Sequence, residues 1–188
     1  MGDRGGERIL TIANALSLVR VLLIPAFVIL IVDRDTSRIG LVLFGIVLAT
    51  DWIDGWVARR TRQVTELGKL LDPLADRLAI LAGLVAVVVR GVFPLWAAIP
   101  ILGRDGAILV AGAALLSSRR ARIDVRFVGK AATFSLMSAI VLVSWGNLGM
   151  PLPRAFLALG WVAYGIGIAE YGVATAMYVG DLRRAFVA

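Results

Sequence analysis

The 188-residue sequence contains no cysteine and no histidine. Without cysteine, the chain has no disulfide, no thiolate nucleophile and no cysteine ligand for zinc or an iron–sulfur cluster. Without histidine, side-chain acid–base chemistry and metal binding depend on carboxylates. These absences exclude several large classes of metalloprotein and of covalent catalyst.

Charged residues are also scarce, at 18% of the chain, whereas hydrophobic residues make up 60%. A soluble domain has about 25% charged and about 45–50% apolar residues. The apolar excess therefore excludes an ordinary soluble globular protein and a disordered chain. The net charge of +7 favours loops that face anionic lipid, with no nucleic-acid partner. We predict an all-α, polytopic membrane protein in which residues 1–188 form one membrane domain.

Six apolar runs are each long enough to cross a hydrocarbon core as a helix, which takes roughly 20 residues. They cover approximately Ile12–Val32, Ile39–Arg59, Leu67–Val89, Pro94–Leu116, Val128–Trp145 and Ala155–Val179. Cytoplasmic segments of membrane proteins carry an excess of Lys and Arg. With the N-terminus inside, 13 of the 20 bases fall in cytoplasmic segments and 4 fall on the opposite side. The sequence thus predicts six transmembrane helices in the plasma membrane, with both termini in the cytoplasm.

Four aspartates lie in or beside two consecutive apolar runs, where a charge costs about 2.5–3.5 kcal/mol on insertion scales. Asp51 and Asp54 are three residues apart, so the pair shares one helix face. Asp72 and Asp76 are four residues apart and share a face in the same way. The short connection Arg60–Glu66 makes the two helices antiparallel neighbours, so the pairs can face each other near the cytoplasmic surface.

Four carboxylates this close need cations in order to stay ionised together. Two divalent ions would bring the local charge to zero, and oxygen ligands suit Mg²⁺ or Mn²⁺ better than zinc or copper. For any single aspartate, an ion pair with a neighbouring Lys or Arg explains the position equally well. For all four together, with Gly55 and Gly68 at fixed offsets beside them, a metal site explains the pattern better.

The residues from Asp51 to Asp76 fit the pattern D-x2-D-G-x2-A-R-x8-G-x3-D-x3-D at every position. This segment resembles the CDP-alcohol phosphotransferase family. The resemblance implies a six-helix membrane fold, usually dimeric, with a two-metal site that opens to the cytoplasm. It also implies transfer of a phosphatidyl group from a CDP-linked lipid to an alcohol, with release of CMP.

By the same resemblance, Asp51, Asp54, Asp72 and Asp76 would bind the metal ions. Asp76 would in addition be the general base toward the acceptor hydroxyl. The residues that would contact the CDP group are Asp51, Gly55, Ala58, Arg59, Gly68 and Asp72.

Weaker segments resemble the phosphatidylglycerophosphate synthase branch of this family. These segments are Asn14–Arg20, Gly68–Arg77, Arg104–Asp105 and Gly129–Thr133. The asparagine usually follows proline in that branch, whereas Ala13 precedes it here. Asn14 and Ser17 would contact substrate.

Three bases in these segments suggest the acceptor. Arg20, Arg104 and Lys130 are costly within a membrane unless they meet anions. A basic pocket for an acceptor that carries its own phosphate, such as glycerol 3-phosphate, would supply that anion. An intramembrane ion pair such as Arg104–Asp105 is the alternative for each base.

Other acceptors and one other class of protein remain open. Cardiolipin synthases of the same fold use phosphatidylglycerol, and inositol-phosphate or serine acceptors differ by only a few pocket side chains. A transporter is the non-enzyme alternative, although it would favour acids spread through the midplane and pseudo-symmetric halves. The expected partners are CDP-diacylglycerol, a polar or lipid alcohol, membrane lipids and a second copy of the chain.

The last apolar run carries four glycines and one acid. Gly160, Gly165, Gly167 and Gly172 predict a face that packs against another helix. Glu170 lies among them and could pair with a base or accept a hydrogen bond from another helix.

Overall fold

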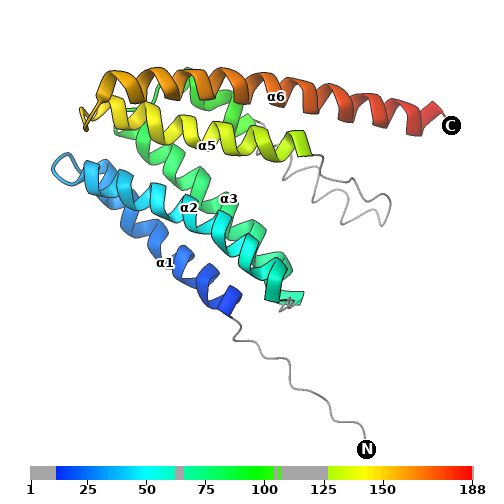
Figure 1. Ribbon diagram of the computed structural model, residues 1–188, viewed down its shortest axis with the longest axis horizontal. Helices are drawn as coiled ribbons and strands as arrows, with labels where there is room; N and C mark the ends of the chain where they lie inside the picture. The colour runs from blue at the N-terminus through cyan, green and yellow to red at the C-terminus, as the bar shows by residue number, and fades with distance from the viewer. Residues whose placement is uncertain (1–11, 62–65, 104–105, 107–126, 188) are drawn as a thin grey trace, which may run out of the picture. The chain divides into compact units, whose positions relative to one another are not determined.

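The computed structural model describes residues 12–61, 66–103, 106 and 127–187, with side chains described for residues 18–50, 77–103, 106 and 131–175. Its labelled helices are α1 (Ile12–Val32), α2 (Ser37–Thr61), α3 (Glu66–Val89), α5 (Phe127–Asn147) and α6 (Pro153–Val187) (Figure 1). Residues 95–103 are also helical, and no strand occurs among the described residues. The predicted all-α class is confirmed.

The helix bounds follow the apolar runs of the sequence. Helix α1 has the predicted bounds, and α3 differs by one residue at its start. Helix α6 is longer than predicted, because its 35 residues continue beyond the apolar run to Val187. Of the predicted span Pro94–Leu116, only the first half lies within the described residues.

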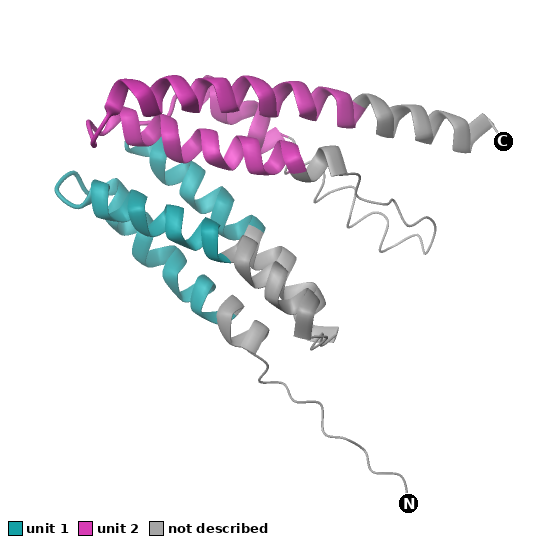
Figure 2. Ribbon diagram, viewed as in Figure 1, with its two compact units in different colours: residues 1–90 teal, residues 91–188 magenta. Residues whose placement is uncertain are grey.

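The chain divides into two compact units, Met1–Arg90 and Gly91–Ala188 (Figure 2). In the first unit, α1 packs against both α2 and α3. The turn between α1 and α2 is closed by Thr36, whose Oγ1 donates to the carbonyl oxygen of Leu30 and to Oδ2 of Asp33, at 3.0 Å each. A Cβ on Gly40 would lie 2.5 Å from the backbone nitrogen of Ile31, so glycine lets α2 approach α1 closely here.

Phe44 is the centre of the core of the first unit. Its ring packs against that of Phe27 on α1, with the ring centroids 5.1 Å apart. On the other side it fills the space beside Gly83 of α3, where a Cβ would overlap the Phe44 ring. Phe27 and Phe44 are fully buried. This contact sets the register of the three helices.

In the second unit, α5 and α6 run side by side (Figure 1). A Cβ on Gly160 would lie 2.7 Å from the backbone nitrogen of Val143, and one on Gly167 would lie 2.7 Å from Leu136 Cγ. At the same test, Gly165 and Gly172 have no neighbour within 4 Å among the described residues. The predicted packing face is therefore confirmed for Gly160 and Gly167. Gly165 and Gly172 lie on a different side of the helix, where packing stays a prediction.

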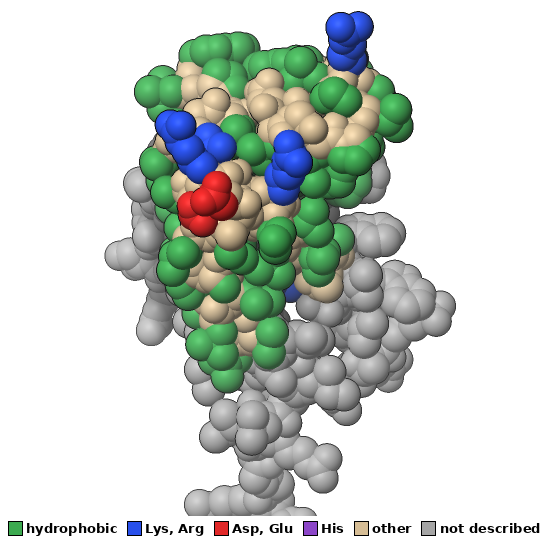
Figure 3. Space-filling view, turned by 90° about the vertical axis from the view of Figure 1, so that its left-hand side faces the viewer, with side chains coloured by type: hydrophobic (Ala, Val, Ile, Leu, Met, Phe, Trp, Pro, Cys, Tyr) green, Lys and Arg blue, Asp and Glu red, His purple; other side chains and the backbone are tan. Residues whose placement is uncertain are grey.

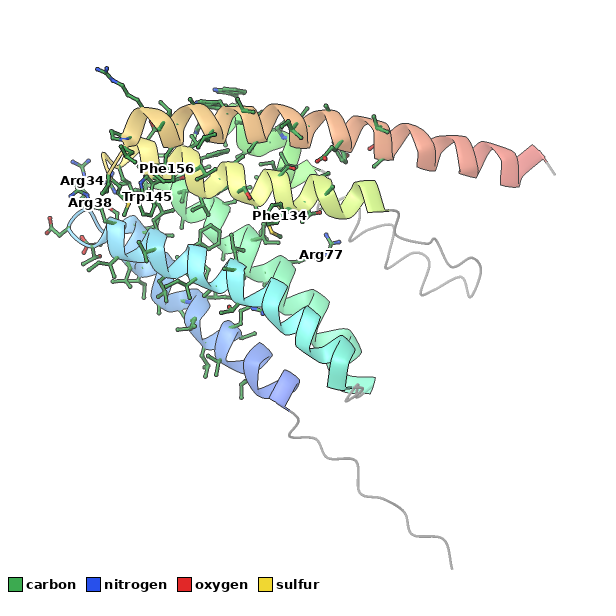
Figure 4. All side chains as sticks on the ribbon, viewed as in Figure 1. Arg34, Arg38, Arg77, Phe134, Trp145 and Phe156 are labelled. Carbon is green, nitrogen blue, oxygen red and sulfur yellow. The ribbon has the colours of Figure 1, made fainter. Side chains whose placement is uncertain are left out.

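Polar contacts close the turns of the second unit. Asn147 Nδ2 donates to the carbonyl oxygen of Val92 at 2.8 Å, and Trp145 Nε1 donates to that of Pro151 at 3.0 Å. The Trp145 ring also packs against Phe156 on α6, with centroids 5.2 Å apart (Figure 4). These contacts fix both ends of the α5–α6 turn.

An aromatic cluster joins residues 95–103 to α6. Trp96 and Trp161 are stacked, with ring centroids 5.3 Å apart and an interplanar angle of 5°. Tyr164 meets both rings edge-on, and its hydroxyl donates to the carbonyl oxygen of Ala97 at 3.2 Å. The half-buried phenol thus has a polar partner beside the two indole rings.

Large apolar side chains are exposed on the described helices. Examples are Leu22, Ile39, Val89 and Phe134, each with more than 60% of its surface exposed. Hydrophobic side chains also cover most of the described surface seen in Figure 3. Exposed apolar surface of this extent marks contact with lipid or with another protein.

One described stretch, Pro153–Thr175 of α6, is long and apolar enough to cross a membrane. Shorter apolar helical stretches are Leu18–Val32, Ser37–Thr50, Arg77–Val89 and Ala131–Asn147. The search covers only the described residues, so six spans and cytoplasmic termini stay predictions.

Candidate active site

The four aspartates of the motif lie on two consecutive helices. Asp51 and Asp54 belong to α2, and Asp72 and Asp76 belong to α3. The helical placement expected from their spacing is therefore observed, while their side chains lie outside the described set. Helix geometry keeps each pair on one face of its helix.

The register of the first unit places three of the site positions at one level. Phe44 contacts both Phe27 and Gly83. Seven residues, which are close to two helical turns, separate Phe27 from position 20, Phe44 from position 51 and Gly83 from position 76. All three steps lead toward the same end of the unit, since α2 runs opposite to α1 and α3 (Figure 1). Positions 20, 51 and 76 thus lie at the same level and on the helix faces that meet in the core.

The other two aspartates, at positions 54 and 72, lie nearer the connection between α2 and α3. Position 54 is three residues beyond position 51 on α2, and position 72 is four residues before position 76 on α3. Both steps are about one turn toward the connection between the helices. The register therefore brings the four positions into two adjacent layers.

Arg20 is the one predicted site residue whose side chain is described. It is buried, with 5% of its surface exposed, and it shares a helix face with the buried Phe27 and Ile31. A base inside an apolar helix bundle is costly unless anionic or hydrogen-bonding groups surround it. The register places it at the level of positions 51 and 76, which both carry aspartate.

The remaining predicted site residues are placed by their backbone only, or lie outside the described residues. Those within described helices are Asn14 and Ser17 on α1, Gly55, Ala58 and Arg59 on α2, Gly68 on α3 and Lys130 on α5. Arg104 lies outside the described residues. Arg20 belongs to the first unit and the other two bases to the second, so the three-base acceptor pocket stays a prediction.

The carboxylate oxygens of the motif are suitable ligands for a hard divalent cation. No group of three or more acidic, histidine or cysteine side chains occurs among the side chains that the structure describes. The motif aspartates lie outside that set and supply only carboxylate oxygens, which suit Mg²⁺ or Mn²⁺.

One polar contact of the second unit was only partly foreseen. Ser135 Oγ of α5 donates to Glu170 Oε2 of α6 at 3.0 Å. The expectation that Glu170 accepts a hydrogen bond from another helix is confirmed. The sequence did not single out Ser135 as the donor, because a hydroxyl in an apolar helix has several common structural explanations.

Comparison with known proteins identifies the family. The family model for CDP-alcohol phosphatidyltransferases matches residues 10–169. The chain is 36% identical to the cardiolipin synthase (CMP-forming) of Streptomyces coelicolor over 183 residues, which cover 95% of this chain and 85% of that protein. A putative cardiolipin synthase of Mycobacterium tuberculosis is 35% identical over 92% of this chain and 82% of its own length.

A relative with a different name matches less of the chain. The CDP-diacylglycerol–glycerol-3-phosphate 3-phosphatidyltransferase of Bacillus subtilis is 36% identical over 80% of this chain and 86% of its own length. Both names describe transferases of phospholipid biosynthesis, which excludes the transporter alternative. The chain belongs to the CDP-alcohol phosphatidyltransferase family and is a membrane-associated transferase.

Proposed function

We propose that the chain transfers the phosphatidyl group of CDP-diacylglycerol to a glycerol that carries a phosphate at one end and a free hydroxyl at the other. The observation that carries this proposal is the complete aspartate motif on two antiparallel helices, with a buried arginine at the same level of the bundle. The reaction joins the acceptor oxygen to the phosphatidyl phosphorus and breaks the pyrophosphate bond to CMP. The released products are CMP and a phospholipid.

The aspartates are proposed to hold the metal ions that the family generally uses. Asp51, Asp54, Asp72 and Asp76 would be the ligands, for two ions of Mg²⁺ or Mn²⁺. When bound, such ions neutralise pyrophosphate and stabilise the charge of an in-line displacement.

The chain's own residues would bind the donor and move one proton. Asp76 takes the proton of the acceptor hydroxyl as the new bond forms, which makes that oxygen a better nucleophile. Gly55, Ala58 and Gly68 are small enough to let the CDP group lie against the helices, and Arg59 complements its phosphate charge. Asn14 and Ser17 are further proposed contacts on α1.

Arg20 is proposed to bind the phosphate of the acceptor, together with Arg104 and Lys130. A guanidinium group can donate two parallel hydrogen bonds to a phosphate, which adds orientation as well as affinity. Burial strengthens this contact, because water competes less for a buried charge. The acceptor is thereby held by the end that does not react.

Phosphatidylglycerol is the acceptor that we favour within this class. The relatives named cardiolipin synthase match 92–95% of the chain, whereas the Bacillus relative matches 80%. Glycerol 3-phosphate is the second candidate, since the segments around Arg20, Arg104 and Lys130 favour it.

The proposed setting is a single membrane domain with six spans and cytoplasmic termini. The exposed apolar side chains on the described helices support a multi-pass arrangement. The site would then face the cytoplasm of the plasma membrane, and the chain would act as a homodimer.

A direct comparison of acceptors tests the proposed function. The purified full chain in lipid nanodiscs receives CDP-diacylglycerol, Mg²⁺ and either isotope-labelled phosphatidylglycerol or isotope-labelled glycerol 3-phosphate. We expect labelled cardiolipin by mass spectrometry, with less product from glycerol 3-phosphate. Phosphatidylglycerophosphate as the sole product would overturn the favoured acceptor, and no product from either would overturn the acceptor class.

A further inference from the structure

Three arginines lie at the end of the first unit that is opposite to the aspartates. Arg34 precedes α2, and Arg38 lies in its first turn (Figure 4). Arg90 directly follows α3; it lies seven residues after Gly83, which contacts Phe44. Phe44 in turn lies six residues after Arg38. Each step is close to two helical turns, and α2 runs opposite to α3 (Figure 1). The register therefore brings Arg38 and Arg90 to the same level.

The side chain of Arg90 starts on the inner face of α3. The Arg90 N–H donates to the carbonyl oxygen of Ala86 at 2.9 Å, so the helical geometry continues to this residue. Seven residues after Gly83, Arg90 lies on the helix face that contacts Phe44. Its side chain is half-buried, and Nε is buried without a hydrogen-bond partner among the described residues. Burying part of a charged group without a partner is costly, so we expect a partner from outside the chain.

The two acids of this end do not pair with the arginines. Asp33 Oδ2 accepts the hydrogen bond of Thr36 Oγ1 at 3.0 Å, which closes the turn between α1 and α2. Neither Asp33 nor Asp35 forms an ion pair with an arginine in the part of the chain that the structure describes. Position 51 lies thirteen residues beyond Arg38 on α2, which corresponds to about 20 Å. Three guanidinium groups thus face two carboxylates at this end, which leaves a positive charge unbalanced.

An exposed apolar side chain lies beside this charge on each helix of the unit. Val32 on α1, Ile39 on α2 and Val89 on α3 are 42%, 63% and 66% exposed. Ile29 and Val85, about one turn further into the unit, are also exposed. Figure 3 looks onto this end and shows charged side chains bordered by hydrophobic ones. Apolar surface therefore extends up to the level of the arginines, and charge lies beyond it.

An anionic phospholipid matches this succession of apolar and charged surface. The family is membrane-associated, and the headgroups of a bilayer lie directly outside its hydrocarbon core. A guanidinium group forms charge-assisted hydrogen bonds with phosphate oxygens. The excess positive charge favours an anionic headgroup over a zwitterionic one. A free phosphate would meet the same arginines but would leave the apolar side chains without a partner.

We propose that Arg34, Arg38 and Arg90 bind the phosphate of an anionic phospholipid at the end of the first unit opposite to the aspartates. Arg90 donates from its buried Nε, and the two exposed arginines hold the headgroup from the side of α2. The acyl chains lie along the apolar surface beside Ile39 and Val89. Because the arginines come from α3 and from the start of α2, one bound lipid would join the two helices. The site does not depend on which acceptor the enzyme uses.

Lipid retention tests the site without turnover. The full chain is purified in mixed micelles that contain equal amounts of phosphatidylmethanol and phosphatidylcholine, and native mass spectrometry counts the bound lipids. Both lipids carry a phosphodiester and neither headgroup has a hydroxyl, but only phosphatidylmethanol has a net charge. We expect the wild type to retain phosphatidylmethanol preferentially. Arg38→Gln and Arg90→Gln should each weaken its binding about tenfold, as the loss of a hydrogen bond to a charged group predicts.

Arg154→Gln is the matched control, because Arg154 is an exposed arginine of the second unit and the variant loses the same charge. It should keep the wild-type preference. Arg34→Gln provides a further test if Arg90→Gln fails to fold, since Arg34 is exposed. Equal retention of both lipids by the wild type would overturn the proposal. So would an unchanged preference in the variants of the three arginines, or an equal loss in Arg154→Gln.

Inorganic phosphate separates a lipid site from a site for a free anion. A large excess of inorganic phosphate should leave phosphatidylmethanol bound, because it offers nothing to the apolar side chains beside the arginines. Displacement of the lipid by inorganic phosphate would assign the arginines to a free phosphate and overturn the lipid as the occupant.

Thermal stability tests whether the lipid joins the helices. A ligand that binds only the folded state stabilises it, so phosphatidylmethanol should raise the unfolding temperature of the wild type more than that of Arg90→Gln. An equal rise in both proteins would contradict a site at Arg90.

This site and the proposed function fail in different ways. CMP release should stay near the wild-type rate in Arg38→Gln and Arg90→Gln, because the arginines lie about 20 Å from position 51 along α2. If the wild type releases CMP but shows no lipid preference, the arginine site is wrong and phosphatidyl transfer stands. If the preference depends on the arginines but no acceptor yields CMP, the site stands and the proposed function is wrong.

Discussion

At the scale of single residues, charge inside an apolar chain is the most informative signal. The aspartates could be singled out from the sequence because each is costly in an apolar helix unless it serves a ligand. The burial of Arg20 on the face of Phe27 agrees with the same reasoning. Ser135 could not be singled out, since its contact with Glu170 depends on how α5 and α6 pack.

Replacing Asp76 by asparagine should mainly abolish turnover. The amide keeps the size of the side chain but cannot take the proton of the acceptor hydroxyl. General-base catalysis typically contributes about 10²–10⁴-fold to the rate. We therefore expect kcat for CMP release to fall at least about 100-fold, measured in nanodiscs at fixed Mg²⁺.

Asp35→Asn is the control for this variant, because Asp35 is an exposed acid in the turn between α1 and α2. It should keep wild-type kcat. An Asp76→Asn enzyme with wild-type turnover would remove the proposed general base.

At the scale of helices, the apolar runs predict where each helix lies but not which face it packs. Four glycines of α6 suggested one packing face, whereas only Gly160 and Gly167 contact α5. The four glycines lie on two different sides of α6, and the position of α5 decides which of these sides forms the packed interface. The close register around Phe44 and Gly83 is likewise a property of packing.

A pair of glycine substitutions on α6 tests this assignment. In Gly160→Ala, the new Cβ would lie 2.7 Å from the backbone nitrogen of Val143, which cannot move by itself. In Gly165→Ala, the new Cβ has no neighbour within 4 Å in the part of the chain that the structure describes. Both variants gain the same helix propensity, so the difference between them measures the cost of the clash.

We expect Gly160→Ala to be about 1–3 kcal/mol less stable than Gly165→Ala, as is typical of overpacking. Denaturation of both variants in the same detergent, followed by tryptophan fluorescence, gives the difference. Equal stability would show that α5 and α6 do not pack through Gly160.

At the scale of the whole molecule, composition predicts a membrane protein, and the exposed apolar side chains of the described helices agree. Hydropathy predicts where the helices lie, because each span must cover the hydrocarbon thickness, although α6 continues beyond its apolar run to Val187. The packing within each unit cannot be read in this way, since it depends on which side chains of neighbouring helices meet, as Phe44 meets Gly83 and Phe27.

Cysteine labelling tests the predicted topology, and the cysteine-free chain is well suited to it. Asp35→Cys replaces an exposed residue in the turn between α1 and α2, and Thr61→Cys replaces the last residue of α2. With the N-terminus inside, an impermeant maleimide should label Asp35→Cys in intact cells and Thr61→Cys only after permeabilisation. Labelling of both variants from the same side would overturn the six-span arrangement.

The most direct test of phosphatidyl transfer at the aspartate motif is metal-dependent CMP release. The full chain in nanodiscs receives CDP-diacylglycerol with phosphatidylglycerol or glycerol 3-phosphate, and CMP and the new phospholipid are quantified together. We predict that both products appear in equal amounts, stop with EDTA, return with Mg²⁺ or Mn²⁺, and are absent in Asp72→Asn. CMP release that continues at full rate in EDTA, or in Asp72→Asn, would contradict the proposed site.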